Sequence, residues 1–229
     1  MTNKPIKTWT EIQAKSSWTM FKILSEFVEG YDRLEAIGPC ISIYGSARTK
    51  EDNKYYQMSV KVAELLVEEG YGIITGGGPG IMEAGNRGAK NVGGKSVGLN
   101  IDLPHEQSSN KYIDEDKLFH FNYFFARKVM FVKYAQAFIL LPGGFGTMDE
   151  LFESLTLIQT KKIDRVPVIL MGTEYWGGLI DWIKNTMLGN NNISEGDIDL
   201  VQLTDSPEEA VNIINEFYES SKTSLKPNF

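Results

Sequence analysis

The chain has 229 residues, enough for one large α/β domain with a sizeable core. Its net charge of −7 argues against a nucleic-acid-binding surface, which needs a basic face. No apolar run approaches the roughly 20 residues that span a membrane, and the polar N-terminus lacks the apolar segment of a signal peptide. We therefore expect a cytoplasmic protein that binds neither nucleic acid nor membrane.

Residues 1–37 are expected to form a helical extension. Apolar side chains recur at three- and four-residue steps from Trp9 to Leu34, a spacing typical of an amphipathic helix. Gly38-Pro39 marks the boundary to the next segment. Because this helix precedes the first strand, we expect it to pack on the outside of the domain or against a partner subunit.

Strands and helices alternate through residues 38–221. The expected strands are short apolar runs: Cys40–Tyr44, Gly72–Thr75, Ser96–Ile101, Leu118–Phe121, Ala137–Leu141, Val166–Met171 and Asp199–Leu203. The expected helices are Tyr55–Glu69, Ile81–Asn91, Phe124–Ala135, Leu151–Ile158, Trp176–Leu188 and Pro207–Ser221. This alternation predicts a single Rossmann-like α/β domain, with a parallel sheet of about six to seven strands, helices on both faces and a tail at 222–229.

Glycine-rich turns follow three of these strands, beginning at Gly45, Gly76 and Gly143. The carboxyl ends of parallel strands are where ligands bind in such sheets. The third turn also lies at a helix N-terminus, where backbone N–H groups and the helix dipole can hold an anion. Tight packing alone could account for each turn, but two long glycine turns on one sheet edge favour a phosphate site.

The spacing of the glycines argues against two common nucleotide-binding motifs. The pattern G-x-G-x-x-G fails at each possible start, because its third glycine falls on Ile81, Glu83 or Asp149. The acidic residue that would bind a ribose hydroxyl is also missing after the first turn. No G-x-x-x-x-G-K-[ST] pattern is present, which argues against a P-loop triphosphatase. A mononucleotide or sugar-phosphate site remains.

Several charged residues near these turns have both a functional and an ordinary structural interpretation. Thr147 to Glu150 fits a capping box, and the residues alone favour capping and catalysis equally for Glu150. Arg127 lies on an apolar helix, where an interface ion pair is the simpler interpretation. Glu83, in the first turn of its helix, suits either the helix dipole or a ligand. The two histidines and single cysteine show no spacing typical of a metal site.

The stretch Pro142–Glu150 resembles the PGGxGTxxE signature of the lonely-guy family, the cytokinin-activating phosphoribohydrolases long labelled lysine decarboxylases. Gly76–Ala84 resembles the family's second glycine-rich segment, and Arg127-Lys128 resembles its basic pair. The resemblance covers roughly residues 38–220. The N-terminal helix and the form of the second segment look closer to the bacterial branch that acts on nucleoside monophosphates.

This resemblance implies hydrolysis of the N-glycosidic bond of a nucleoside 5′-monophosphate, AMP or a cytokinin ribotide, to free base and ribose 5-phosphate. It implies Glu150 and Arg127 as catalytic residues, no metal or organic cofactor, and a homodimer. The implied substrate-binding residues are Gly45, Ser46, Gly77, Gly78, Glu83, Lys128, Gly143, Gly144, Gly146 and Thr147. Two alternatives stay open: a non-catalytic nucleotide sensor, and a pyridoxal-phosphate decarboxylase with Lys128 as its Schiff-base lysine.

Overall fold

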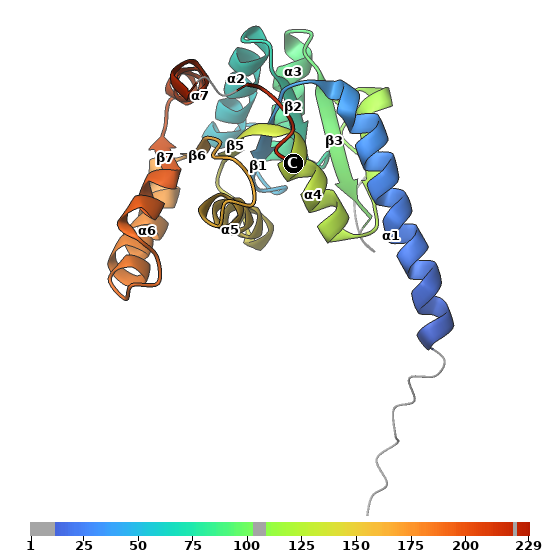
Figure 1. The fold of residues 1–229 in the computed structure, drawn as a ribbon. Helices are drawn as coiled ribbons and strands as arrows, with labels where there is room; N and C mark the ends of the chain where they lie inside the picture. The colour runs from blue at the N-terminus through green and yellow to red at the C-terminus, as the bar shows by residue number, and fades with distance from the viewer. Residues whose placement is uncertain (1–11, 103–108, 222–223) are drawn as a thin grey trace, which may run out of the picture.

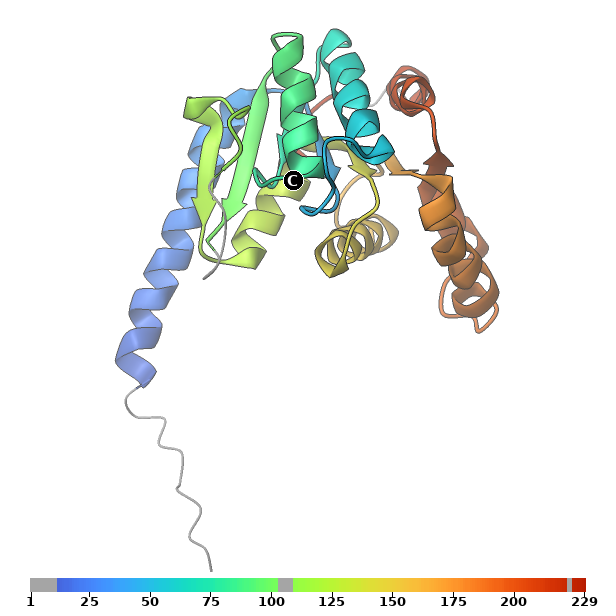
Figure 2. The same cartoon turned by 180° about the vertical axis from the view of Figure 1, so that it is seen from behind.

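A computed structural model describes residues 12–102, 109–221 and 224–229. Seven parallel strands form one sheet in the order β4-β3-β2-β1-β5-β6-β7 (Figures 1 and 2). The strands are β1 (Cys40–Tyr44), β2 (Gly72–Thr75), β3 (Ser96–Ile101), β4 (Leu118–Phe121), β5 (Ala135–Leu140), β6 (Val168–Met171) and β7 (Val201–Thr204). The predicted Rossmann-like α/β fold is confirmed, and β1 to β4 have the predicted bounds.

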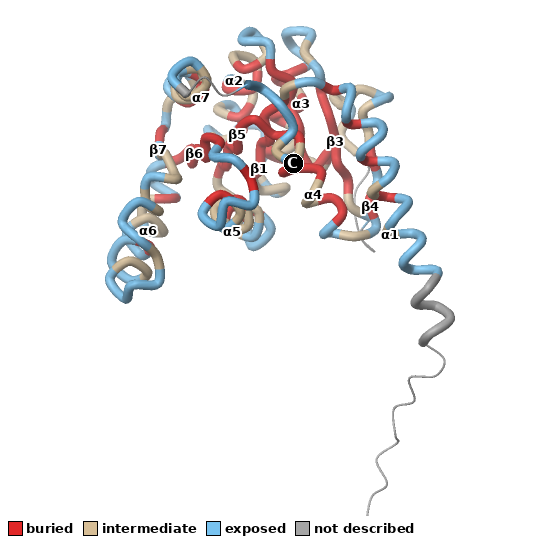
Figure 3. Tube along the Cα trace, viewed as in Figure 1, coloured by how far each residue is buried: buried red, intermediate tan, exposed pale blue. Residues whose placement is uncertain are grey.

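Helices cover both faces of this sheet. They are α1 (Ile12–Leu34), α2 (Lys54–Glu68), α3 (Ile81–Asn91), α4 (Phe124–Tyr134), α5 (Phe145–Gln159), α6 (Thr173–Trp182) and α7 (Pro207–Ser221). Short 3-10 helices span η1 (Glu35–Ile37), η2 (Glu115–Lys117) and η4 (Glu195–Leu200), and α6 continues as a π-helical segment, η3 (Ile183–Leu188). Helices α2, α3 and α7 pack on one face, whereas α1, α4, α5 and α6 pack on the other. In Figure 3 the strands form the buried middle layer.

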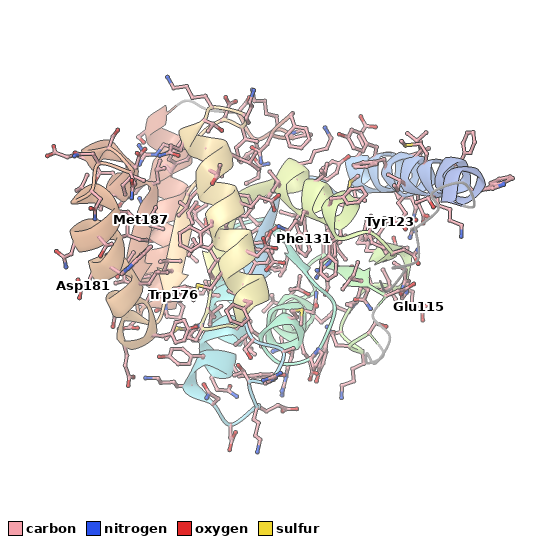
Figure 4. All side chains as sticks on the ribbon, turned by 90° about the horizontal axis from the view of Figure 1, so that it is seen from below. Glu115, Tyr123, Phe131, Trp176, Asp181 and Met187 are labelled. Carbon is pink, nitrogen blue, oxygen red and sulfur yellow. The ribbon has the colours of Figure 1, made fainter. Side chains whose placement is uncertain are left out.

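Two apolar layers stabilise the fold, one on each side of the sheet. Phe131 of α4 and Trp176 of α6, both labelled in Figure 4, belong to one layer and are almost completely buried. Leu66 of α2 and Ile214 of α7 belong to the other and are fully buried. Burying each large apolar side chain contributes about 1.5–3 kcal/mol. Because β1 is buried at all five positions, it is apolar except at Ser42, whose hydroxyl donates to the Phe131 carbonyl.

The strand order reverses between β1 and β5. Moving outward from β1, the chain adds β2, β3 and β4 on one side, then returns to pair β5 with the other side of β1. The turns after β1 and β5 therefore lie side by side, and the Ser46 N–H donates a hydrogen bond to the Pro142 carbonyl over 3.0 Å. Such a switch point is where open α/β sheets bind ligands.

The start of α5 corrects the capping-box interpretation. That interpretation makes Thr147 the N-cap, but the helix begins at Phe145, with Gly144 as N-cap and no side-chain cap. Thr147 therefore lies within the first turn, where its side chain is buried. The Gly-Phe-Gly sequence is typical of a loop, yet its last two residues, Phe145 and Gly146, are helical. The N-cap therefore lies three residues earlier than the capping box predicts.

Helix α6 also differs from its expected span. It begins at Thr173, directly after Gly172, and becomes π-helical after Trp182, so the expected Trp176–Leu188 helix is two segments. The expected helix start at Trp9 lies outside the described residues.

The C-terminal part of helix α1 packs beside α4, and the rest of α1 extends past the edge of the domain (Figures 1 and 2). Leu34 at its end is fully buried, whereas Trp18, Phe21 and Val28 are 63–70% exposed. Within the part of the chain that the structure describes, no helix has both the length and the apolar character needed to cross a membrane.

Candidate active site

A cleft of about 990 Å³ lies at the carboxyl edge of the sheet, where the turns after β1, β2 and β5 meet the N-terminal parts of α4 and α5. Nine of the predicted site residues line it: Gly45, Ser46, Gly78, Arg127, Gly143, Gly144, Gly146, Thr147 and Glu150. Hollows beside α7 and beside α1 are smaller, about 730 and 770 Å³, and contain none of these residues. The structure thus brings residues from distant parts of the chain to one site.

The glycines of the three turns fall into two groups, one needed for close packing and one that leaves open space in the cleft. A methyl group added at Gly45 would overlap the Ile81 side chain, and one added at Gly143 would overlap Thr147, so these two glycines are needed for packing. At Gly144 and Gly146 an added methyl group would meet no described atom within 4 Å. These two positions face open space, so a ligand can approach their backbone closely.

The N-terminus of α5 has the properties of an anion site. Gly144 provides no side-chain cap, and the first intrahelical bond runs from the Met148 N–H to the Gly144 carbonyl over 3.1 Å. The preceding N–H groups, from Phe145 to Thr147, therefore lack intrahelical acceptors. They lie at the positive end of a 15-residue helix. This arrangement suits a phosphate group.

Arg127 brings a buried positive charge to the cleft from α4. Its side chain is only 9% exposed, its Nε donates to the Leu99 carbonyl over 2.6 Å, and its guanidinium lies 5.0 Å from the centre of the Phe131 ring. A methyl group at Gly76 would overlap the guanidinium, so this glycine provides the space for it. These contacts hold a positive charge and a planar guanidinium in the wall of the cleft, which suits Arg127 to an anionic or electron-rich ligand.

Glu150 brings a carboxyl group to the same cleft from α5. Burial raises the pKa of Glu150 to about 7; Arg127 and Lys128 oppose this increase, whereas Asp149 and Glu153 add to it. Among the described residues, no side chain or backbone group makes a hydrogen bond to its carboxyl oxygens. A carboxyl group that ionises near neutral pH can act as a general base or stabilise a developing positive charge.

Three predicted site residues lie outside the cleft lining. Gly77, with φ of +73°, packs against Asn100, and Glu83 accepts a hydrogen bond from the Tyr56 hydroxyl over 3.2 Å. Lys128 points to α5 and forms ion pairs, described below. The structure therefore places these three residues where they support the walls of the cleft.

The cleft lining also includes residues that the sequence analysis did not single out, and two of them stand out by their contacts. Asn100, at the carboxyl end of β3, is 91% buried, and its Oδ1 atom has no hydrogen-bond partner among the described residues. A polar residue near the end of an apolar strand was the signal that could have identified it. Tyr175 comes from the start of α6, and its hydroxyl donates to the Gly143 carbonyl over 2.5 Å. No sequence pattern connects it to the turn that it supports.

The fold and the cleft define a Rossmann-like α/β protein with an uncapped helix N-terminus, a buried arginine and a carboxyl group at its switch point. The family model described as "Possible lysine decarboxylase" matches residues 82–214, which is more than half of the chain. The chain belongs to this family, the lonely-guy family that its glycine-rich motifs resemble.

Curated relatives of the chain include named enzymes. A probable cytokinin riboside 5′-monophosphate phosphoribohydrolase from Oryza sativa subsp. japonica is 32% identical over 137 residues, covering 58% of this chain and 54% of the rice protein. A cytokinin riboside 5′-monophosphate phosphoribohydrolase from Mycobacterium tuberculosis is 27% identical over 158 residues, covering 68% and 82%. An uncharacterized protein from Archaeoglobus fulgidus is 31% identical over 135 residues, covering 58% and 83%. The chain spans about half the length of the rice relative.

Solved structures share the fold. The structure of TM1055 has a TM-score of 0.60 at 23% identity and covers 78% of this chain and 99% of that one. The molybdenum cofactor carrier protein from Chlamydomonas reinhardtii has a TM-score of 0.58 at 21% identity and covers 80% and 99%. At this level of identity the likeness shows the fold alone. Among the described residues, no three His, Cys, Asp or Glu side chains gather closely enough to hold a metal ion.

Proposed function

We propose that the chain hydrolyses the N-glycosidic bond of nucleoside 5′-monophosphates, AMP or a cytokinin ribotide, to give free base and ribose 5-phosphate. The observation that carries this proposal is the meeting of Glu150 and Arg127 in one cleft with an uncapped helix N-terminus. The names of the rice and mycobacterial relatives support it.

The phosphate binds at the N-terminus of α5 in this proposal. Gly144 and Gly146 leave room for its oxygens, and the N–H groups of the first turn donate to them. Holding the phosphate at this end places the ribose deeper in the cleft, within reach of the side chains on α4 and α5. The binding free energy of the phosphate then positions the sugar for reaction.

The reaction breaks the bond between the anomeric carbon and the base nitrogen, and a bond from water oxygen to that carbon replaces it. Positive charge develops on the sugar as the bond breaks, as in glycoside hydrolysis generally. Ionised Glu150 stabilises that charge and accepts a proton from the attacking water. The base leaves with the bonding electron pair and takes up a proton from solvent, and Glu150 returns to its ionised form by releasing the proton it accepted from water. Arg127, at the ends of β2 and β3, faces the departing base.

A homodimer is part of the proposal. Helices α1 and α4 expose large apolar side chains, including Phe21 and Leu24 on α1 and Phe124 and Phe125 on α4. Phe124 also lines the cleft, so a second copy covering this surface would help to enclose the substrate. Light scattering should give twice the chain mass, and a Phe21→Glu, Leu24→Glu variant should give the single mass.

The residues do not fit a pyridoxal-phosphate decarboxylase. A Schiff-base lysine must lose its proton and reach the aldehyde of a cofactor whose phosphate is bound nearby. Lys128 lies outside the cleft lining and is held in ion pairs with two carboxylates, which outweigh the effect of burial and raise its pKa. Both its position and its charge oppose such a role.

Incubation of the purified protein with AMP tests the proposal, with adenine and ribose 5-phosphate measured by chromatography. We expect turnover by the wild type, and no turnover but retained AMP binding by Glu150→Gln. A wild type that binds AMP tightly and leaves it intact would instead support a non-catalytic sensor. A wild type that leaves AMP and the other common nucleoside monophosphates intact without binding them refutes the proposal.

A further inference from the structure

Lys128 connects two helices that carry the proposed catalytic groups. Its Nζ lies 2.6 Å from an Asp149 carboxyl oxygen and 3.2 Å from a Glu153 carboxyl oxygen, and its side chain is only 19% exposed. Asp149 and Glu153 are four residues apart, so they lie on the same side of α5. One cation on α4 thus binds two carboxylates on α5.

The neighbours of these residues in the sequence are the charged groups of the cleft. Arg127 directly precedes Lys128 on α4, and Glu150 directly follows Asp149 on α5. Adjacent residues on a helix point about 100° apart. An ion pair formed on one side of the two helices therefore sets the rotation with which Arg127 and Glu150 face the cleft.

Lys128 also balances the charges around Glu150. The charged and titratable groups that act on Glu150 are Arg127 and Lys128 from α4 and Asp149 and Glu153 from α5; Tyr44 of β1, buried beside them, is itself influenced by Glu150. Without Lys128, two flanking carboxylates would face Glu150 with only Arg127 to compensate them. A like charge nearby disfavours ionisation of a carboxyl group.

We infer that Lys128 is a positioning residue: it holds α4 and α5 in register and brings a positive charge close to Glu150, and it does not itself bind the substrate. The inference rests on the proposed function only in that Glu150 is taken as the reacting carboxylate. It assigns to Lys128 a role different from the substrate contact that the family motif implies.

The test compares Lys128→Met, Lys128→Arg and a control, Lys226→Met, which removes a lysine from an exposed ion pair with Asp164. Carbon-13 NMR of the glutamate carboxyl groups follows the titration of Glu150, with Glu150→Gln to assign its signal. In Lys128→Met we expect the titration midpoint of Glu150 to rise by roughly one pH unit. Lys128→Arg and Lys226→Met should stay close to the wild type.

Kinetics with AMP provide the second measurement. In Lys128→Met the acid limb of the kcat profile should move to higher pH by the same amount, so kcat at pH 6 falls about tenfold. KM should stay within about twofold, because no substrate contact is lost. A KM raised tenfold or more with an unchanged Glu150 midpoint overturns the inference and makes Lys128 a substrate ligand.

Two further outcomes are separable. If the wild type does not hydrolyse AMP, the proposed function fails, while the NMR titration still decides the role of Lys128. If Lys128→Met does not fold, Asp149→Asn with Glu153→Gln removes the two carboxylates instead. In that variant the Glu150 midpoint should fall below that of the wild type, and a rise contradicts the inference.

Discussion

Replacement of Glu150 by glutamine should make the protein more stable and inactive, and the stability gain should depend on pH. The unperturbed pKa of this carboxyl group is 4.5, and burial raises it to about 7 in the folded protein. The folded state therefore binds a proton at Glu150 more tightly than the unfolded state does. The contribution of Glu150 to the free energy of unfolding is fully present below pH 4.5, and it is lost as the pH rises through 7.

The size of this loss follows from the pKa values. The difference between 4.5 and about 7, at about 1.4 kcal/mol per pH unit, corresponds to about 3 kcal/mol above pH 7. Glutamine has nearly the same shape and cannot ionise, so the variant avoids this cost. The favourable interaction of the carboxylate with Arg127 is already included in the net pKa, because Arg127 acts to lower it.

Urea denaturation of the wild type and of Glu150→Gln at pH 5 and at pH 8 measures the effect. The variant should exceed the wild type by about 3 kcal/mol at pH 8 and by less than about 1 kcal/mol at pH 5. Glu68→Gln, at the exposed end of α2, is the matched control and should change neither value. An equal gain at both pH values, or a loss at pH 8, would refute the reasoning.

Three further predictions concern the cleft. Arg127→Lys should reduce kcat/KM for AMP by about 10²–10³-fold, because a lysine lacks the planar guanidinium; a loss below tenfold contradicts this role. Gly143→Ala should destabilise the protein by about 1–3 kcal/mol in a denaturation experiment, because the added methyl group overlaps Thr147. Gly146→Ala should keep most of the stability in the same experiment but should weaken AMP binding measured by calorimetry. Asn100→Leu should stabilise the protein by about 1–3 kcal/mol, because it removes a buried oxygen that has no hydrogen-bond partner among the described residues. The same variant should weaken AMP binding measured by calorimetry, and an unchanged affinity would contradict a contact between Asn100 and the ligand.

The fold was largely predictable because its signals are local. Each of the strands β1 to β4 is a short apolar run between residues that end a strand, so its limits follow from composition alone. Gly70, with φ of +92°, closes α2: the Gly70 N–H donates to the Val67 carbonyl and the Tyr71 N–H to that of Leu66. Ser206, directly before α7, accepts a hydrogen bond from the Glu209 N–H, which is the usual role of a serine at a helix N-terminus.

The candidate site was predictable only in part, because its side chains meet through tertiary packing. The glycine turns indicate the edge of the sheet that binds a ligand, and the family motif indicates Glu150 and Arg127, whereas the strand order that creates the switch point was not predicted. The start of α5 was not predictable, because Gly-Phe-Gly favours a loop and Thr147 fits a cap. The partners of Lys128 lie on another helix, so no local pattern distinguishes an ion pair from a substrate contact.

The corrected start of α5 also explains how the cleft can bind an anion. A serine or aspartate cap stabilises a helix by about 1 kcal/mol, but its oxygen accepts hydrogen bonds from the same N–H groups that a phosphate needs. With Gly144 as N-cap, those groups stay available, and Glu150 lies further along the helix as a carboxyl group whose ionisation burial opposes. The free N–H groups and the buried carboxyl group both lower the stability of the empty protein. A bound nucleotide would give each of them an interaction partner. The N-terminus of α5 and Glu150 therefore contribute little to the free energy of folding, and ligand binding can gain the most free energy at these two groups.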